Sequence, residues 1–128
     1  MIQDSLTIRI GGEAGMGLES SGAGFSKALT RGGLYVFGLP DYYSRIRGGH
    51  NFYSIRIARR PLYSHSDPIH LLLALDAETV RRHVDKIVPG GGIVYDAKEE
   101  LPDDVRRPDV GFFPIPLTLI LLLLGLIL

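Results

Sequence analysis

The spacing of apolar side chains changes several times along the first forty residues, and each spacing predicts one element. Residues 6–10 alternate between apolar and polar side chains, as in a β-strand with one covered face. Residues 11–17 form a glycine-rich turn, and residues 34–38 form a short apolar strand. Between them the pattern predicts a helix that the glycine pair at 32–33 would end. The apolar face of this helix carries Leu18, Gly22, Phe25 and Leu29.

The second half of the chain continues this alternation of elements. Residues 51–58 alternate again, whereas residues 70–75 form a continuous apolar run, typical of a strand covered on both faces. Asp76 can cap a following helix, which the Pro-Gly-Gly-Gly run at 89–92 would end. Residues 93–95 and 110–115 predict two further strands. The apolar face of the second helix carries Val80, Val84, Ile87 and Val88.

The order of these elements predicts an α/β fold. We expect a three-layer open sheet, mostly parallel or mixed, with helices on both faces. No helix is predicted between the strands at 34–38 and 51–58. This stretch would therefore add an antiparallel pair and make the sheet mixed.

The last twelve residues have a different composition. Residues 117–128 are apolar except for Thr118 and Gly125. As a helix they would span about 18 Å, against about 30 Å for the hydrocarbon core of a bilayer. We therefore expect no spanning helix and assign residues 1–116 to one domain with 117–128 as a tail. The tail is either a buried helix or the result of a truncation or an altered reading frame.

Composition limits the chemistry that the chain can supply. Its 128 residues include no Cys, which excludes a disulfide framework, a thiol nucleophile, a Cys-based zinc site and a thiolate-ligated iron–sulfur cluster. Fourteen basic residues balance fourteen acidic ones, so no net charge attracts nucleic acid or a membrane, and we expect neither as a partner. No secretory signal is visible, and we expect a cytoplasmic protein.

Charge is nevertheless unevenly distributed along the chain. Residues 42–66 contain no acid, while residues 67–109 contain ten acids and six bases, a balance of −4. This division suits docking between oppositely charged surfaces, although a solvated basic edge beside an acidic face would give the same pattern. The five positive charges of the basic segment are Arg45, Arg47, Arg56, Arg59 and Arg60.

Two segments are candidates for an anion site. In the turn at 11–17, backbone N–H groups of Gly12, Gly15 and Gly17 at a helix N-terminus could meet a phosphate. The turn is neither a Walker loop nor a clean G-x-G-x-x-G, because Ser20 stands at the third glycine position. A tight strand-to-helix turn without a ligand is the alternative.

The second candidate is the loop at 41–51, which combines aromatic, arginine and glycine residues. Such a loop, after a strand of an open α/β sheet, lies where ligands bind. Its side chains could hold a phosphate or carboxylate, or an acidic partner surface. The alternative is a connection whose arginines pair with Asp41 and its neighbours. The candidate binding residues are Arg45, Arg47, Gly48, Gly49, His50 and Asn51.

No catalytic or metal-ligating group is expected. Ser64, His65 and Asp67 lie too close in sequence for the usual relay, and no nucleophile elbow is present, so a capped turn is expected there. The four histidines do not share metal-ligand spacing.

Taken in order, the segments at 11–17, 47–51, 73–76, 89–96 and 113–116 resemble one family. These segments read Gly-Gly-Glu-Ala-Gly-Met-Gly, Arg-Gly-Gly-His-Asn, Leu-Ala-Leu-Asp, Pro-Gly-Gly-Gly-Ile-Val-Tyr-Asp and Phe-Pro-Ile-Pro. The chain resembles the gamma subunit or domain of 2-oxoacid:ferredoxin oxidoreductases, the pyruvate and 2-oxoglutarate synthases. The Glu-Ala-Gly form of the first turn is most similar to the version fused to the N-terminus of the alpha subunit. The similarity covers residues 6–116, which makes 1–116 a gamma-type domain.

The resemblance implies a function. Such complexes oxidatively decarboxylate a 2-oxoacid to an acyl-CoA and pass electrons to ferredoxin. Thiamine diphosphate and the iron–sulfur clusters would lie in partner alpha and beta subunits, and this domain would contribute coenzyme A binding and assembly. Departures from the family are Tyr43, where proline is frequent, and the apolar tail at 117–128, where the family continues with an amphipathic helix.

Two other functions compete with this one. A stand-alone nucleotide-binding module would bind NAD or ATP at the glycine-rich turn. It is disfavoured because Gly38-Leu-Pro40 stands where an acidic ribose-binding residue is expected. A purely structural interaction domain would bind no small ligand and would use the arginine loop for contacts alone.

Overall fold

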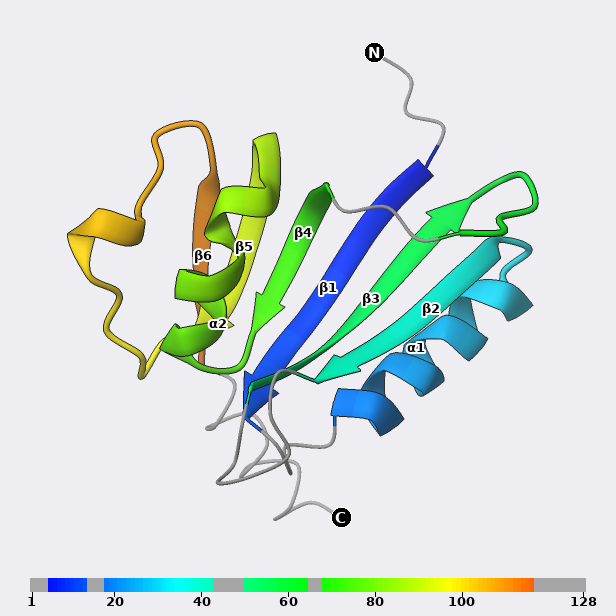
Figure 1. The fold of residues 1–128 in the computed structure, drawn as a ribbon, viewed down its shortest axis with the longest axis horizontal. Helices are drawn as coiled ribbons and strands as arrows, with labels where there is room; N and C mark the ends of the chain where they lie inside the picture. Colours follow the sequence, from blue (N-terminus) through cyan, green and yellow to red (C-terminus); the bar gives the residue numbers. More distant parts are fainter. Residues whose placement is uncertain (1–4, 14–17, 43–49, 65–67, 117–128) are drawn as a thin grey trace.

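The computed structural model describes residues 5–13, 18–42, 50–64 and 68–116. These contain six strands, two α-helices and two short 3-10 helices (Figure 1). The strands are β1 (Ser5–Glu13), β2 (Tyr35–Tyr42), β3 (His50–Ala58), β4 (Ile69–Ala74), β5 (Ile87–Asp96) and β6 (Gly111–Ile115). The helices are α1 (Leu18–Arg31) and α2 (Ala77–His83), with 3-10 turns η1 (Val84–Lys86) and η2 (Asp103–Val105).

The strands form one mixed sheet in the order β2-β3-β1-β4-β5-β6. Strand β3 is antiparallel to both neighbours, β1 and β2, while the β1–β4, β4–β5 and β5–β6 pairs are parallel. Every described strand except β3 therefore runs in one direction, and their carboxyl ends meet at the lower edge in Figure 1. This confirms the α/β class and the antiparallel pair expected between residues 34 and 58.

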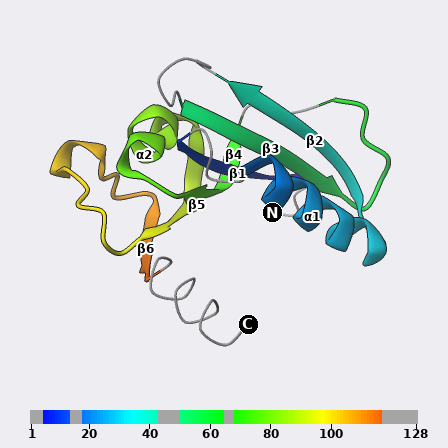
Figure 2. The ribbon, with the colours of Figure 1, turned by 90° about the horizontal axis from the view of Figure 1, so that it is seen from below.

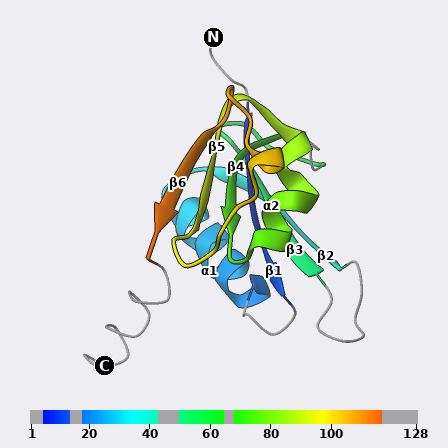
Figure 3. The same ribbon diagram turned by 90° about the vertical axis from the view of Figure 1, so that its left-hand side faces the viewer.

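The two α-helices cover opposite faces of the sheet, which gives the three expected layers (Figures 2 and 3). On one side, α2 packs on a core that includes Leu72, Val80 and Ile93. On the other, Leu29 of α1 packs on a core that includes Ile10 and Ile55. Strand β4 serves both cores because alternate residues of its apolar run point to opposite faces.

The end of the second helix is not where the sequence pattern predicts it. The α-helix stops at His83, a 3-10 turn continues to Lys86, and β5 begins at Ile87. Pro89–Gly92 therefore lie inside a strand and do not end a helix. Ile87 is buried in either case, since as a strand residue it joins the same core. A Cβ on Gly91 would lie 2.9 Å from the His70 carbonyl oxygen, so this glycine permits the close approach of β4.

Strands β1 and β2 also extend beyond their predicted bounds. Strand β1 continues through Gly11 and Gly12 to Glu13, which narrows the glycine-rich turn. Strand β2 continues past Gly38 to Tyr42 and includes Pro40. A proline lacks a backbone N–H, but β2 lies at the edge of the sheet, where proline is tolerated.

Candidate functional site

The carboxyl end of β1 and the amino end of β3 form the centre of the candidate site. In the antiparallel ladder Gly12 lies opposite Asn51, and Glu13 lies opposite His50. The backbone N–H of Leu75, just after β4, donates to the Gly11 carbonyl oxygen over 2.9 Å. Three predicted site residues, Gly12, His50 and Asn51, are thus brought together at one edge of the sheet.

The other predicted site residues, Gly15, Gly17, Arg45, Arg47, Gly48 and Gly49, lie outside the described residues. The points where their segments join the fold are nevertheless defined. Residues 14–17 follow Glu13, and residues 43–49 connect Tyr42 to His50. Tyr42 and Asn51 are cross-strand partners, so both ends of the arginine-containing segment start from this edge.

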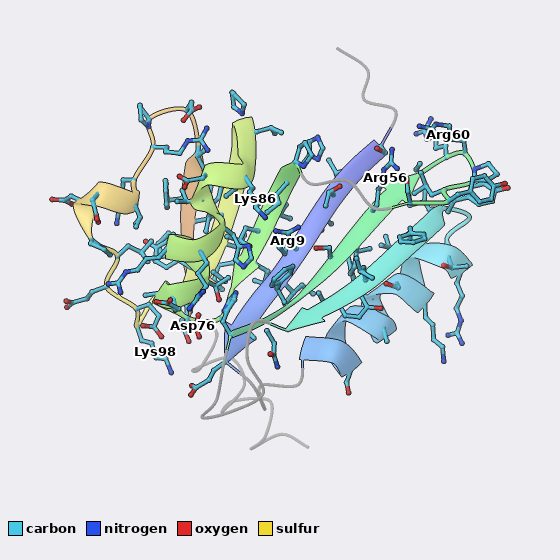
Figure 4. The ribbon with its side chains drawn as sticks, in the orientation of Figure 1. Arg9, Arg56, Arg60, Asp76, Lys86 and Lys98 are labelled. Carbon is cyan, nitrogen blue, oxygen red and sulfur yellow. The ribbon has the colours of Figure 1, made fainter. Side chains whose placement is uncertain are left out.

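At this end of the sheet, the connections that follow two neighbouring strands lead to opposite faces. Strand β1 continues into α1 on one face, whereas β4, its parallel neighbour, continues into α2 on the other. In open α/β sheets such a switch leaves a crevice outside the carboxyl ends of the strands, where ligands bind. Asp76, labelled in Figure 4, lies at this edge, at the start of α2.

Helix α2 begins against β1. The Asp76 Oδ1 accepts hydrogen bonds from the Thr79 backbone N–H over 2.9 Å and from the Thr79 hydroxyl over 2.6 Å. This cap satisfies a backbone N–H group that a helix start leaves open. A Cβ added to Gly11 would run into the methyl group of the fully buried Thr79. Gly11 is therefore required for the close approach of β1 to α2.

A buried chain of polar side chains links β1, α2 and β3 behind this edge. A terminal nitrogen of Arg9 lies 3.1 Å from His83 Nδ1, and His83 Nε2 lies 2.7 Å from His50 Nε2. Arg9, His83 and His50 are 3%, 0% and 6% exposed. Figure 4 labels Arg9 beside β1, the strand between β3 and β4. His50 is thus buried against α2, and its ring stands against His83.

The environment keeps these imidazoles neutral. Burial, then the Arg9 guanidinium and the His50 ring, lower the pKa of His83 from 6.5 to about 3. Burial also lowers the pKa of His50, with nearby Asp76 acting in the opposite direction. Neither ring carries a charge at neutral pH, so His50 enters the site as a neutral hydrogen-bonding group.

Asn51 faces the opposite side of the sheet, toward α1. Side chains alternate along β3, and Tyr53, two residues on, packs in the core on the α1 side. The Asn51 Oδ1 is enclosed and accepts no hydrogen bond from any residue that the structure describes. A buried carbonyl without a donor costs about 1–3 kcal/mol, so this atom is suited to receive a donor from a ligand.

The structure divides the basic segment into two parts. Strand β3 carries Arg56 and the following Arg59 and Arg60 to the end of the sheet opposite His50, where Figure 4 labels Arg56 and Arg60. The Arg56 guanidinium donates to the Ser5 hydroxyl and the Ser64 carbonyl, as an internal anchor. Arg56, Arg59 and Arg60 therefore lie away from the site, and only Arg45 and Arg47 belong to the segment that precedes His50 in the sequence.

Sequence reasoning missed Arg9, Thr79 and His83. His83 stands three residues after Val80, on the apolar face of the helix, and a histidine in that position signals a buried polar contact. Arg9 was hidden by an alternating strand pattern, which marks one face as polar without saying what covers it. Among the described residues, no group of three His, Asp or Glu side chains could hold a metal ion.

Within the described ranges, no helix combines the length and the apolar character that crossing a membrane requires. The apolar tail at 117–128 and the Ser64–Asp67 segment, apart from Ser64, lie outside those ranges.

Comparison with known proteins gives a consistent result. Residues 7–127 match the family described as pyruvate ferredoxin/flavodoxin oxidoreductase. The alpha subunit of 2-oxoacid:ferredoxin oxidoreductase 2 from Aeropyrum pernix is 38% identical over 91 residues, which are 71% of this chain and 14% of that protein. An alpha subunit from Sulfolobus sp. is 38% identical over 74 residues, 58% of this chain and 12% of that protein. The chain thus spans a small part of these relatives.

Solved structures resemble the fold over nearly all of the chain. A 2-oxoglutarate:ferredoxin oxidoreductase from Magnetococcus marinus, with 2-oxoglutarate, coenzyme A and succinyl-CoA bound, matches with a TM-score of 0.82 and 32% identity. The match covers 92% of this chain and 21% of that one. A keto/oxoacid ferredoxin oxidoreductase gamma subunit from Geobacter sulfurreducens has the same fold, with a TM-score of 0.69 and 21% identity over 87% of this chain and 61% of its own.

Proposed function

The chain belongs to the pyruvate ferredoxin/flavodoxin oxidoreductase family, and on that premise we propose that it binds coenzyme A and helps to assemble a 2-oxoacid:ferredoxin oxidoreductase. The complete enzyme would convert a 2-oxoacid and coenzyme A to an acyl-CoA and carbon dioxide, and would pass two electrons to ferredoxin. This chain is then one component of the enzyme and does not complete the reaction alone.

Partners would supply the redox chemistry. Thiamine diphosphate, which would stabilise the carbanion left by decarboxylation, and the iron–sulfur clusters would sit on alpha and beta subunits. The chain has no Cys, so it offers no thiolate for a cluster. Its own contribution would be to bind and orient coenzyme A.

The observation that carries the proposal is the meeting of two sequence segments at one edge. The ladder that pairs Gly12 with Asn51 and Glu13 with His50 brings the residues that lead into the glycine-rich turn beside those that follow the arginine-containing segment, at the carboxyl ends of β1 and β4. Coenzyme A carries phosphates and amide N–H groups. Backbone N–H groups and arginine forks bind phosphates, and the enclosed Asn51 Oδ1 suits an amide donor.

We assign the phosphate contacts to Gly12, Gly15, Gly17, Arg45, Arg47, Gly48 and Gly49. His50 and Asn51 join the arginine-containing segment to β3. They contribute the neutral imidazole and the side-chain amide of the site. The 2-oxoacid itself would be recognised elsewhere in the complex.

Charge reversal in the assembled complex tests this assignment. We expect Arg45→Glu with Arg47→Glu to raise the KM for coenzyme A by about tenfold or more and to leave the KM for the 2-oxoacid unchanged. The matched control is Arg59→Glu with Arg60→Glu, the same change on exposed arginines that follow the opposite end of β3. Unchanged coenzyme A affinity and unchanged subunit association in the first variant would overturn the assignment. Loss of association alone would favour the interaction domain.

A further inference from the structure

The hydrogen bonds that link Arg9, His83 and His50 can run in one direction only. An arginine guanidinium only donates, so His83 Nδ1 must accept over the 3.1 Å contact. A neutral His83 then carries its proton on Nε2 and donates to His50 Nε2 over 2.7 Å. A neutral His50 in turn holds its proton on Nδ1. The charge on Arg9 thereby fixes the tautomer of two rings in succession.

The Arg9 end of the chain is itself held in place. Arg9 Nε donates to the Ser54 hydroxyl over 2.8 Å, and the guanidinium lies 4.6 Å from the centre of the Phe52 ring. Phe52 also meets His83 edge-on, with 4.7 Å between ring centres. Ser54 and Phe52 lie on the same strand as His50, so Arg9 and His83 are both packed against β3.

This arrangement is a poor way to gain stability alone. Burying a guanidinium and two imidazoles costs desolvation that hydrogen bonds must offset, and apolar side chains of similar size commonly serve a core as well or better. What the polar chain does supply is a fixed orientation. It ends on His50, the first residue of β3 and the residue at which the 43–49 segment joins the sheet.

We propose that Arg9 and His83 are positioning residues for the coenzyme A site. The directional hydrogen bonds from Arg9 through His83 fix the orientation of the His50 ring, at the residue where the arginine-containing segment joins β3. The inference rests on the proposed function in naming coenzyme A as the ligand. The chain's direction and its effect on His50 are independent of that name. In this proposal Arg9 and His83 act through His50 and do not themselves bind the ligand.

The donor-to-acceptor direction of the hydrogen bonds from Arg9 to His83 to His50 is tested without any ligand. The sequence has four histidines, so the full chain labelled with 15N-histidine gives a spectrum simple enough to assign by replacing each histidine in turn. We expect the His83 signal to report a proton on Nε2 and the His50 signal a proton on Nδ1, both at neutral pH. In Arg9→Met this preference should be lost while Phe52 and Ser54 remain. A proton on His83 Nδ1 in the unaltered chain would overturn the inference.

The effect on the site is tested in the assembled complex with coenzyme A as the varied substrate. His83→Leu removes both hydrogen bonds and should raise the KM for coenzyme A about tenfold, with no change in the KM for the 2-oxoacid. His83→Gln, which keeps an acceptor and a donor, should restore the KM to within about twofold. His70→Gln is the control, because His70 accepts a hydrogen bond from the Thr7 backbone N–H and is not one of the three residues Arg9, His83 and His50.

If His83→Leu changes the thermal stability but not the KM for coenzyme A, the hydrogen bonds from Arg9 to His50 have a structural role alone and the inference is overturned. A His83→Gln variant as impaired as His83→Leu would overturn it as well. These outcomes are separate from failure of the proposed function. If Arg45→Glu with Arg47→Glu leaves coenzyme A binding and assembly unchanged while the tautomers are as expected, the ligand assignment fails and the direction of the chain stands.

Discussion

Gly12 of β1 lies directly opposite Asn51 of β3 in an antiparallel ladder. Gly12 belongs to the glycine-rich segment and Asn51 follows the arginine-containing segment by two residues, so the ladder of β1 and β3 joins the ends of the two segments. Because side chains alternate along a strand, a slip of one residue would turn His50 away from α2 and Asn51 toward it. The register of this one strand pair therefore decides which groups each side of the site receives.

Replacing Gly11 by Ala should destabilise the fold. The new methyl group would meet Thr79, which is fully buried, and lie 3.4 Å from the His50 ring. Neither neighbour can move freely, so we expect a loss of about 1–3 kcal/mol in the free energy of unfolding, measured by urea denaturation.

Two variants make this prediction specific. Gly24→Ala is the matched control, since a Cβ there meets nothing within 4 Å and the residue lies in α1, where Ala favours the helix by about 0.5–1 kcal/mol. Thr79→Ser removes the obstructing methyl group and keeps the hydroxyl that donates to Asp76. Gly11→Ala should cost less in the Thr79→Ser background. An equal cost in both backgrounds would contradict the steric explanation.

Removing the helix cap should weaken α2. Asp76→Ala deletes the acceptor for both the backbone N–H and the hydroxyl of Thr79, and a lost cap typically costs about 1 kcal/mol. Asp76→Asn retains an oxygen acceptor and should recover most of that loss. Equal destabilisation by the two changes, in the same denaturation measurement, would show that charge and not capping is the cause.

Acid should destabilise the protein through His83. Its pKa is about 3 when folded and 6.5 otherwise, so between these values the unfolded chain binds a proton that the folded chain does not. The contribution of His83 to the free energy of unfolding is therefore fully present above pH 6.5. Below that pH it falls by about 1.4 kcal/mol for each pH unit. Burial lowers the pKa of His50 and His70 as well, which adds to the loss in the same direction.

The His83→Gln variant isolates this contribution, since glutamine does not titrate. Its unfolding free energy, measured by denaturation from pH 7 to pH 4, should depend less steeply on pH than that of the unaltered chain. Arg9, Arg82 and Lys86 act with burial on His83, so the variant removes their combined effect. Parallel curves for the two proteins would exclude His83 as the source.

Arg107 should stabilise the turn from η1 into β5. One of its terminal nitrogens donates to the Val84 and Ile87 carbonyls over 2.7 and 2.8 Å, and the rest of its fork binds the Asp109 carboxylate. We expect Arg107→Ala to cost about 1–2 kcal/mol of unfolding free energy by urea denaturation. Arg81→Ala is the control, because Arg81 is exposed and its contact with Glu78 is 3.9 Å long. A comparable loss in both variants would contradict the prediction.

Much of the fold could be predicted from local pattern. The apolar run at 70–75 correctly predicts a strand covered on both faces, and Asp76 correctly predicts a helix start. The end of that helix could not be predicted in the same way. An apolar Ile87 is needed whether the chain continues as a helix or turns into β5, and only pairing with Ile69 of β4 distinguishes the two.

By itself, the sequence determined the α/β class and the mixed sheet, and it predicted two segments that could meet an anion, because periodicity, glycine clusters and charge runs are local properties of the chain. Only the tertiary structure decided that Gly12 pairs with Asn51, that Arg56 stands at the far end of the sheet from His50, and that Arg9 reaches His83. These are contacts between residues distant in sequence. They arise from strand register and from the packing of α2 over β1, which no spacing along the chain encodes.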